Sequence, residues 1–486
     1  MLMFKKAAIV LFVVFAIGAV YGIFKPLPKG VRVAWPARNV SNASVQFFAD
    51  RTYTDTAGMR HQEQEIFDEI FRMINGAESY VLVDMFLFND MLGSATTSHR
   101  ALSQELTDAL IAKKRQRPRA LVHVVTDPVN GIYGGYESLQ IEQLRAAGIS
   151  VTETNLSALR DSNPVFSGAW RTVFQWIPTT NIPGFLPNIL DARKSKLGVR
   201  PYLAALNFKA NHRKVVVADY VSGGQSSIAT LITSANPHDG SSAHSNMAVK
   251  VRTALWRDVI ESERAVADFS GTILTRVPAQ FAAQIKDETG DVAVQLVTEG
   301  AIRDVVLKNI YALKRGDTLD MAMFYLSDRK VIAALKNADA RGVQLRVLLD
   351  PNKDAFGRNK DGVPNRQVAD ELLKNSTGNT QIRWCDTHGE QCHSKLLLFH
   401  SDVLETMIAG SANLTRRNIG DYNLESNVVV SGERVRAIAE AHAFFDETWT
   451  NADGKIYSTE YDTYKNESLL KTIQYRVMEV TGASSF

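Results

Sequence analysis

The sequence predicts an α/β protein of two similar lobes, each a mixed β-sheet flanked by helices, that meet around a pseudo-twofold axis. One observation is an internal repeat. The order strand, helix, strand, helix and two further strands occurs twice, and both copies end in the same polar residues. The other observation is size and composition, because 486 residues are too many for one ordinary core, and 45% hydrophobic with 22% charged residues is typical of a globular chain.

The first expected element is a membrane-spanning helix at residues 7–24. This run has no charged residue, follows Lys5 and Lys6, and is close to the shortest length that crosses a hydrocarbon core of about 30 Å. The apolar core of a signal sequence is usually shorter, about 7–15 residues. We therefore expect an uncleaved anchor, with a signal sequence as the alternative. Cations on both sides leave its orientation open, and residues 25–45 are expected to form a linker.

The first lobe is expected over residues 46–276. The segment Leu-Val-Asp-Met-Phe at 82–86 follows an amphipathic stretch and has the composition of a buried strand. A second strand at 120–126 ends in Asp127-Pro128. A helix at 254–269 is expected to close the lobe.

An insertion at residues 156–206 separates these elements from the rest of the first lobe and has no counterpart in the second half. It combines aromatic residues, prolines and a basic cluster. Aromatic rings beside cations suit a membrane interface, but the same rings would also fill a lid or the core between the lobes. Either role would bring the insertion close to the segment that begins at Asn207.

The second half repeats these elements. The segment Leu-Asp-Met-Ala-Met-Phe at 319–324 repeats the strand at 82–86, a strand at 343–349 ends in Asp350-Pro351, and a closing helix is expected at 433–449. The expected boundaries are an interlobe linker at 277–292, a second lobe at 293–450 and a C-terminal tail at 451–486. The tail is expected to form a short strand or a helix on the second lobe.

Each half also contains the same chemical motif. His212 and Lys214 enter one apolar run, and His393 and Lys395 enter another. Because side chains alternate along a strand, the members of each pair point to the same side. The next strand-like runs carry the matching polar residues Ser234 and Asn236 in the first half and Ser411 and Asn413 in the second. The repetition predicts one site assembled from two halves.

These motifs resemble the phospholipase D superfamily, whose signature is a doubled His-x-Lys-x4-Asp followed by Gly-Ser-x-x-Asn. The resemblance covers about residues 46–450 and implies two phospholipase D-like lobes. The first copy includes Asp219, although Thr233 replaces the usual glycine. The second copy has His400 at the acidic position and Asp402 two residues later, so either the strand end is shifted or the acidic role is absent.

One further difference separates the halves. Glu425, an acidic residue typical of this superfamily, aligns with His244 of the first half. By resemblance, Asp219 and Glu425 are expected to orient the catalytic groups. A surface aspartate at the end of a strand is the more ordinary interpretation of Asp219.

The motif residues have the chemistry that a phosphodiester needs. Lys214 and Lys395, with the serine and asparagine side chains of the motifs, can bind the phosphate oxygens without a metal or any other cofactor. One neutral imidazole can attack phosphorus while a protonated one donates to the leaving alkoxide, and the two histidines titrate as a coupled pair. By resemblance, His212 is the nucleophile and His393 the acid/base.

Cys385 and Cys392, the two cysteines of the chain, bracket a short loop before His393. In an oxidising compartment a disulfide would brace this loop, and two buried thiols are the alternative. A zinc site with His388 and His393 is less consistent, because His393 already belongs to the catalytic motif. The cysteine pair favours an extracytoplasmic domain.

The sequence therefore predicts a membrane-anchored phospholipid phosphodiesterase or phosphatidyltransferase, as in cardiolipin synthases or phospholipase D. The expected partners are a phospholipid substrate and the membrane. A net charge of +3 gives no broad basic surface, so nucleic acid is not expected to bind, and the oligomeric state stays open. The alternatives are a nuclease with the same residues and a catalytically inactive, membrane-tethered binding protein.

Overall fold

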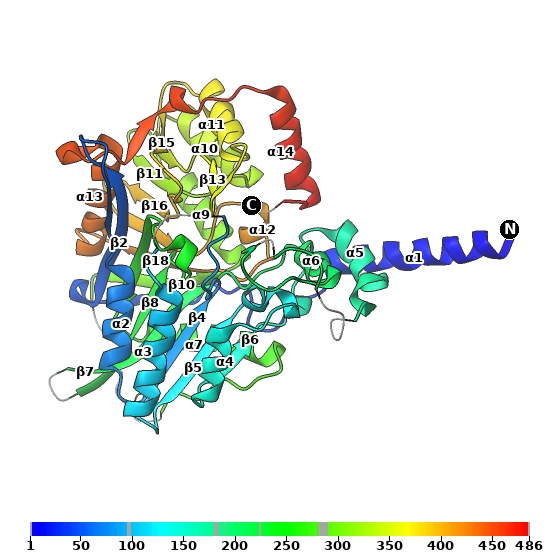
Figure 1. The fold of residues 1–486 in the computed structure, drawn as a ribbon. Helices are drawn as coiled ribbons and strands as arrows, with labels where there is room; N and C mark the ends of the chain where they lie inside the picture. The colour runs from blue at the N-terminus through cyan, green and yellow to red at the C-terminus, as the bar shows by residue number, and fades with distance from the viewer. Residues whose placement is uncertain are drawn as a thin grey trace.

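Two large β-sheets form the centre of the protein (Figure 1). A computed structural model describes residues 2–94, 99–178, 184–188, 190–222, 225–278, 281 and 290–484. The first sheet has the order β3 (Arg60–Glu63), β2 (Val45–Thr54), β9 (Asn246–Val251), β8 (Gln225–Thr233), β7 (Lys214–Ser222), β4 (Tyr80–Met85), β5 (Leu121–Thr126), β6 (Ser150–Glu153). The second has the order β1 (Arg38–Val40), β10 (Val292–Thr298), β18 (Ser426–Gly432), β17 (Glu405–Gly410), β16 (Lys395–His400), β11 (Thr318–Met323), β12 (Gln344–Leu349), β15 (Thr380–Cys385), β19 (Ser458–Glu460).

The two sheets repeat one topology. The order β9-β8-β7-β4-β5-β6 in the first matches β18-β17-β16-β11-β12-β15 in the second. In both, the fourth strand is antiparallel to the third and parallel to the fifth. The register matches as well, because Lys214 lies opposite Met85 and Lys395 lies opposite Met323. The predicted α/β fold of two similar halves is confirmed.

Three hydrophobic clusters hold the layers together. The largest contains apolar side chains of both sheets, such as Val217 and Leu398, so the sheets share a core. On the outer faces, amphipathic helices cover each sheet with apolar residues spaced three or four apart, as Ile66, Ile70 and Ile74 are. These helices are α2 (Ile66–Gly76), α3 (Leu102–Gln116) and α4 (Leu139–Ala146) on the first sheet, and α9 (Gly300–Ala312), α10 (Arg329–Ala340) and α11 (Asn365–Lys374) on the second.

The two closing helices form close to their expected positions. They are α7 (Leu255–Phe269) and α13 (Arg436–Thr450). Helix α13 also reaches the first sheet, where the Phe444 ring lies 5.9 Å from the Phe47 ring of β2. The closing helix of the second half therefore helps to join the halves.

Segments outside the repeat also form regular secondary structure. Residues 38–40 of the expected linker form β1, which pairs with β10 of the second sheet. The C-terminal tail forms β19, which pairs with β15, and helix α14 (Leu469–Thr481). Most of the expected interlobe linker, at 279–280 and 282–289, lies outside the described residues. The lobe boundaries stay a prediction.

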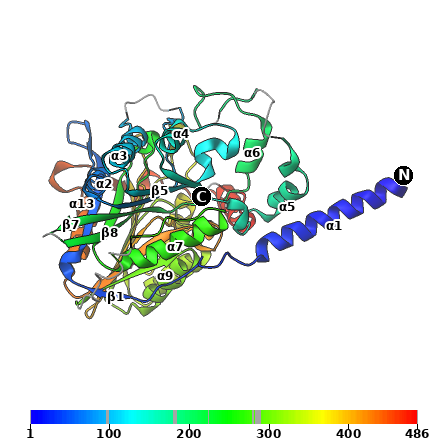
Figure 2. The ribbon, with the colours of Figure 1, turned by 90° about the horizontal axis from the view of Figure 1, so that it is seen from below.

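Helix α1 (Leu2–Phe24) extends away from the body of the protein (Figures 1 and 2). Its segment Phe4–Phe24 is long and apolar enough to cross a membrane. The C-terminal end of α1 contacts α5 (Pro164–Thr172) of the insertion, where Arg171 Nη1 donates to the Gly18 carbonyl at 2.9 Å. The insertion also forms α6 (Val199–Ala205).

Candidate active site

The two His-x-Lys motifs meet at one pocket of about 460 Å³. His212 and His393 both line it, and each precedes the strand that begins with its lysine, β7 or β16. The pocket lies where the two halves face each other, because His212 N donates to the Leu424 carbonyl at 2.9 Å and His393 N donates to the Ser245 carbonyl at 2.8 Å. Each histidine is therefore held by the opposite half.

His212 is oriented by a carboxylate of the second half. Its Nδ1 lies 3.0 Å from Glu425 Oε2, and Glu425 is fully buried. The preceding residue is fixed as well, because Asn211 N donates to Asp127 Oδ2 at 2.6 Å. With Nδ1 bonded to a carboxylate, the other ring nitrogen, Nε2, is left to react.

His393 has a neutral partner at the corresponding position. Its Nδ1 lies 3.1 Å from Asn246 Oδ1. The preceding residue repeats the first half, because Cys392 N donates to Asp350 Oδ2 at 2.8 Å. The two halves thus share the backbone support but differ in the charge beside the imidazole.

Aromatic rings complete both halves of the site. The Phe86 ring centroid lies 4.8 Å from the His212 ring, and the Phe324 centroid lies 5.0 Å from the His393 ring. Lys214 Nζ and Lys395 Nζ each lie 5.1 Å from the centroid of the phenylalanine of the same half. Each Nζ also donates to the backbone carbonyl of its own histidine at 2.6 Å.

Burial makes positive charge costly in this pocket. It lowers the pKa of His212 to about 4 against the opposing effect of Glu425, and it lowers the pKa of Lys214 to about 7. Burial and the nearby Lys395 hold the pKa of His393 well below its usual value. Burial and the nearby Lys214 likewise hold the pKa of Lys395 well below its usual value. A bound anion would favour the charged forms again, so the arrangement suits an anionic ligand.

The four expected phosphate-binding residues divide into two groups. Asn236 and Asn413 line the pocket. The two serine hydroxyls instead support its orienting groups, because Ser234 Oγ donates to Asn246 Oδ1 at 3.0 Å and Ser411 Oγ donates to Glu425. Neither serine is among the residues that line the pocket, so contact of Ser234 and Ser411 with phosphate stays a prediction.

Asp219 lies away from the pocket, near the opposite end of β7. Its buried carboxylate accepts from Ser79 N at 3.1 Å and Tyr80 N at 2.8 Å, at the start of β4. These backbone bonds make Asp219 a support of the sheet, and its expected role in catalysis stays a prediction. In the second half, His400 takes the matching position and is exposed beside Glu405, with 3.3 Å between Nδ1 and Oε1. Asp402 is also exposed, so neither residue repeats the support.

Several site residues were missed by sequence reasoning. Asp127 and Asp350 were recognised as repeated strand ends, and that repetition was the available signal for their support of the histidine backbones. Asn246 was missed because a carboxylate was expected beside the histidine. Arg213 lies between His212 and Lys214 and points to the other side of the chain, where it pairs with buried Glu263 and Glu299.

The insertion forms part of the pocket wall through Leu190 and Ala205, and Phe208, just after the insertion, also lines the pocket. Other rings of the insertion stay exposed, with Trp176 at 74% and Phe185 at 61% of their full accessibility. The insertion thus borders the site without burying all its aromatic residues. Its residues 179–183 and 189 lie outside the described part of the chain.

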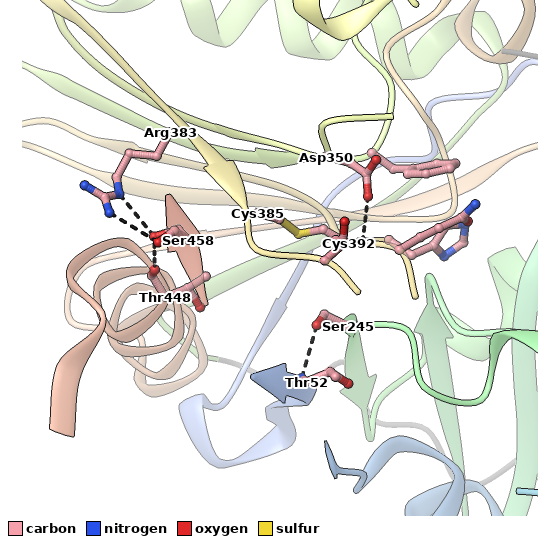
Figure 3. The surroundings of a disulfide bond; sticks show 12 residues. Thr52, Ser245, Asp350, Arg383, Cys385, Cys392, Thr448 and Ser458 are labelled. Atoms are coloured by element: carbon pink, nitrogen blue, oxygen red, sulfur yellow. Dashed lines mark hydrogen bonds between the residues drawn. A yellow bond between two sulfur atoms is a disulfide. The ribbon is translucent and has the colours of Figure 1, made fainter. Parts of the chain in front are cut away.

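Cys385 and Cys392 form a disulfide directly before His393, with their Cα atoms 6.1 Å apart (Figure 3). The bond joins the end of β15 to the residue that Asp350 holds. Because the two sulfur atoms are bonded to each other, they are not available as ligands for the alternative zinc site. Over the described residues, no group of three or more His, Cys, Asp or Glu side chains is arranged to hold a metal ion.

Replacing both cysteines by serine, C385S/C392S, should lower the free energy of unfolding by about 2–3 kcal/mol, because the closed loop restricts the unfolded chain. Urea unfolding of both proteins with and without reductant measures this effect. Reductant should shift the wild-type midpoint to that of the variant and leave the variant unchanged. Coincident midpoints of the oxidised wild type and the variant would contradict the expectation.

Comparisons with known proteins agree with the motifs and the fold. A family model described as the phospholipase D-like domain of cardiolipin synthase matches residues 309–449. Phosphatidylserine synthase from Haemophilus influenzae Rd KW20 has a similar structure, with a TM-score of 0.57 over 92% of this chain and 96% of that chain at 10% identity. The phospholipase D family member Nuc from Salmonella typhimurium matches with a TM-score of 0.28, covering 34% of this chain and 98% of that chain at 19% identity. A search of curated proteins found no significant match.

Proposed function

Because this chain belongs to the phospholipase D superfamily, we propose that it cleaves or transfers the phosphodiester of a phospholipid through a covalent phosphohistidine. One observation carries the proposal: His212 and His393 line one pocket, each with a buried lysine two residues away. Two imidazoles can divide the displacement into two steps, and the lysines can balance the charge of the phosphate.

In the first step, His212 Nε2 attacks phosphorus, the bond from phosphorus to the leaving alkoxide breaks, and His393 donates a proton to that oxygen. In the second, His393 takes a proton from water or an alcohol, whose oxygen attacks phosphorus as the phosphorus–nitrogen bond breaks. Glu425 supports this assignment of roles, because a carboxylate beside His212 stabilises the positive charge on the ring once Nε2 is bonded to phosphorus.

We also propose that α1 is an uncleaved membrane anchor and that the pocket faces the extracytoplasmic side. The apolar length of Phe4–Phe24 supports the anchor. The Cys385–Cys392 bond supports the side, because disulfides persist in oxidising compartments. In a Met59→Cys variant, a membrane-impermeant maleimide added to intact cells would label the new cysteine only if the body of the protein faces outward, because Met59 is 61% exposed.

The test of the activity is incubation of the detergent-solubilised protein with labelled phosphatidylglycerol, with and without glycerol, and separation of the lipids by mass. Cardiolipin or an exchanged headgroup would identify a phosphatidyltransferase. Phosphatidic acid alone would identify a hydrolase. No turnover of this or other phospholipids, with the H212A variant as the blank, would overturn the proposal in favour of a nuclease or a binding protein.

Glu425→Gln should lower kcat by about 10²-fold while the protein stays folded. The amide oxygen can still accept from His212 Nδ1, but the negative charge is lost. Since Glu425 raises the pKa of His212 against burial, the variant should also move the acid limb of the kcat/KM profile to lower pH. The control is Glu261→Gln, the same substitution at an exposed glutamate. If kcat of E425Q were within about twofold of the wild-type value, the proposed role of the Glu425 charge would be contradicted.

A further inference from the structure

Helix α14 presents an apolar face that nothing in the described chain covers. Counted at 3.6 residues per turn, the face occupies one arc of about 100°. It consists of Leu469, Leu470, Ile473, Val477 and Val480, which are 71%, 79%, 51%, 55% and 74% exposed. The opposite side of the helix carries the buried Tyr475 and Glu479. Helix α14 therefore has two distinct faces, and its apolar face points outward.

Buried hydrogen bonds fix this orientation. Tyr475 Oη accepts from Arg329 Nη1 at 3.0 Å and donates to the Ser327 carbonyl at 3.3 Å. Glu479 accepts from Ser327 Oγ at 2.8 Å and from Arg416 N at 3.1 Å. Turning the apolar face inward would break these bonds and expose the two buried side chains to water, so the apolar face is available only to a partner outside the described chain.

The position of α14 identifies that partner. Helix α14 lies on the side of the body from which α1 leaves, and it runs across the direction of α1 (Figures 1 and 2). A bilayer crossed by α1 would therefore lie alongside α14. The exposed apolar residues Val165, Val173 and Trp176 of the insertion add to the same side, because α5 contacts α1.

We propose that α14 is an interfacial helix that buries its apolar face in the boundary region of the bilayer spanned by α1. This inference rests on α1 as an anchor and goes beyond the proposed catalysis. The apolar face matches a helix that lies in the membrane plane, with its polar side on the protein.

This contact has a route to the active site. Helix α12 (Arg416–Ile419) is held by Glu479 through Arg416 N, and Arg417 Nη1 donates to the Ser484 carbonyl at 2.6 Å just beyond α14. Arg417 and Asn418 line the catalytic pocket. If α14 lies in the bilayer surface, the contacts between α14 and α12 hold this wall of the pocket at a fixed distance from the lipid.

The test is spin labelling of the full-length protein in vesicles of phosphatidylglycerol and phosphatidylethanolamine. Val477→Cys reports on α14 and Val13→Cys reports on α1. Met59→Cys is the control, because Met59 is an apolar residue, 61% exposed, in the turn between β2 and β3. Strand β2 lies on the side of the body opposite α1 (Figure 1). The disulfide occupies both native cysteines, so each label has one site.

Lipid-soluble oxygen should relax the nitroxide at positions 477 and 13 more strongly than a water-soluble nickel chelate, and the order should reverse at position 59. Preference for nickel at 477 with oxygen preference at 13 would overturn the interfacial helix and leave the anchor. Nickel preference at 13 would overturn the anchor and the inference with it. Protection of 477 from both reagents would mean a protein partner and overturn the lipid assignment, and dipolar broadening would identify a second copy.

A second label at Leu470→Cys, about two turns closer to the start of α14 on the same face, checks that the result at position 477 does not depend on that one substitution. Thermal unfolding confirms that each labelled protein is folded. These measurements record contact with lipid and not turnover. They therefore test the position of α14 even if the protein proves to have no activity on phospholipids.

Discussion

His212→Ala and His393→Ala should each lower phospholipid turnover by about 10⁴-fold or more. His212 is expected to form the bond to phosphorus, and His393 is expected to protonate the leaving oxygen. The lysine amines are bonded to the histidine carbonyls, and the third imidazole that lines the pocket, His244, accepts from Gln391 N at its Nδ1. Steady-state assays of both variants measure the loss. The control is His61→Ala, since His61 is 41% exposed at its side chain and pairs with Asp55 on the surface.

A substrate with a good leaving group separates the two roles. An aryl phosphodiester whose phenol has a low pKa needs no proton to depart. H393A should therefore release one equivalent of phenol in a burst and then stop, with the phosphoryl group on His212. H212A should give no burst. A burst in H212A and none in H393A would reverse the assignment, and appreciable turnover of phospholipid by either variant would remove the paired-histidine mechanism.

Arg213→Met should lower the free energy of unfolding by about 3–5 kcal/mol, because it leaves buried carboxylates without their cation. Arg213 Nη1 lies 3.1 Å from Glu263 Oε1 and Nη2 lies 2.7 Å from Glu299 Oε1, and all three side chains are buried. Glu263 belongs to α7 and Glu299 precedes α9, so the arginine also links the halves. Chemical denaturation with full baselines measures the change.

The control for this loss is Arg264→Met, which removes an exposed ion pair to Glu261 from the same helix and should change stability by less than about 0.5 kcal/mol. Adding Glu263→Gln to R213M should restore part of the loss, because one of the unpaired charges is then removed. A loss below about 1 kcal/mol for R213M alone would contradict the importance of the buried charges.

The repeat and the two His-Lys pairs could be predicted because they depend on local rules. Alternation along a strand places His212 beside Lys214, and duplication of the motif implies two halves. The same geometry explains why Asp219 lies away from the pocket. Five residues of strand beyond Lys214 span about 16 Å, which puts the carboxylate near the far end of β7.

The remaining features depend on contacts between distant segments. Asn246 approaches His393 only after the halves pack, and the sequence gives no sign that an amide replaces a carboxylate there. Strand β1 is three residues long and forms because β10 offers an edge for pairing. A short polar segment of this kind has no periodic signal of its own.

The exchange of partners between halves has a consequence for how the protein is made. Glu425 lies 213 residues after His212 in the sequence, and His393 lies 147 residues after Asn246. A ribosome therefore completes the whole first half while its histidine still lacks the carboxylate. A chain released early, or cut between the halves, would carry one motif without its partner. Under the proposed mechanism, neither half alone would carry a complete site, so the activity would arise only at the end of synthesis.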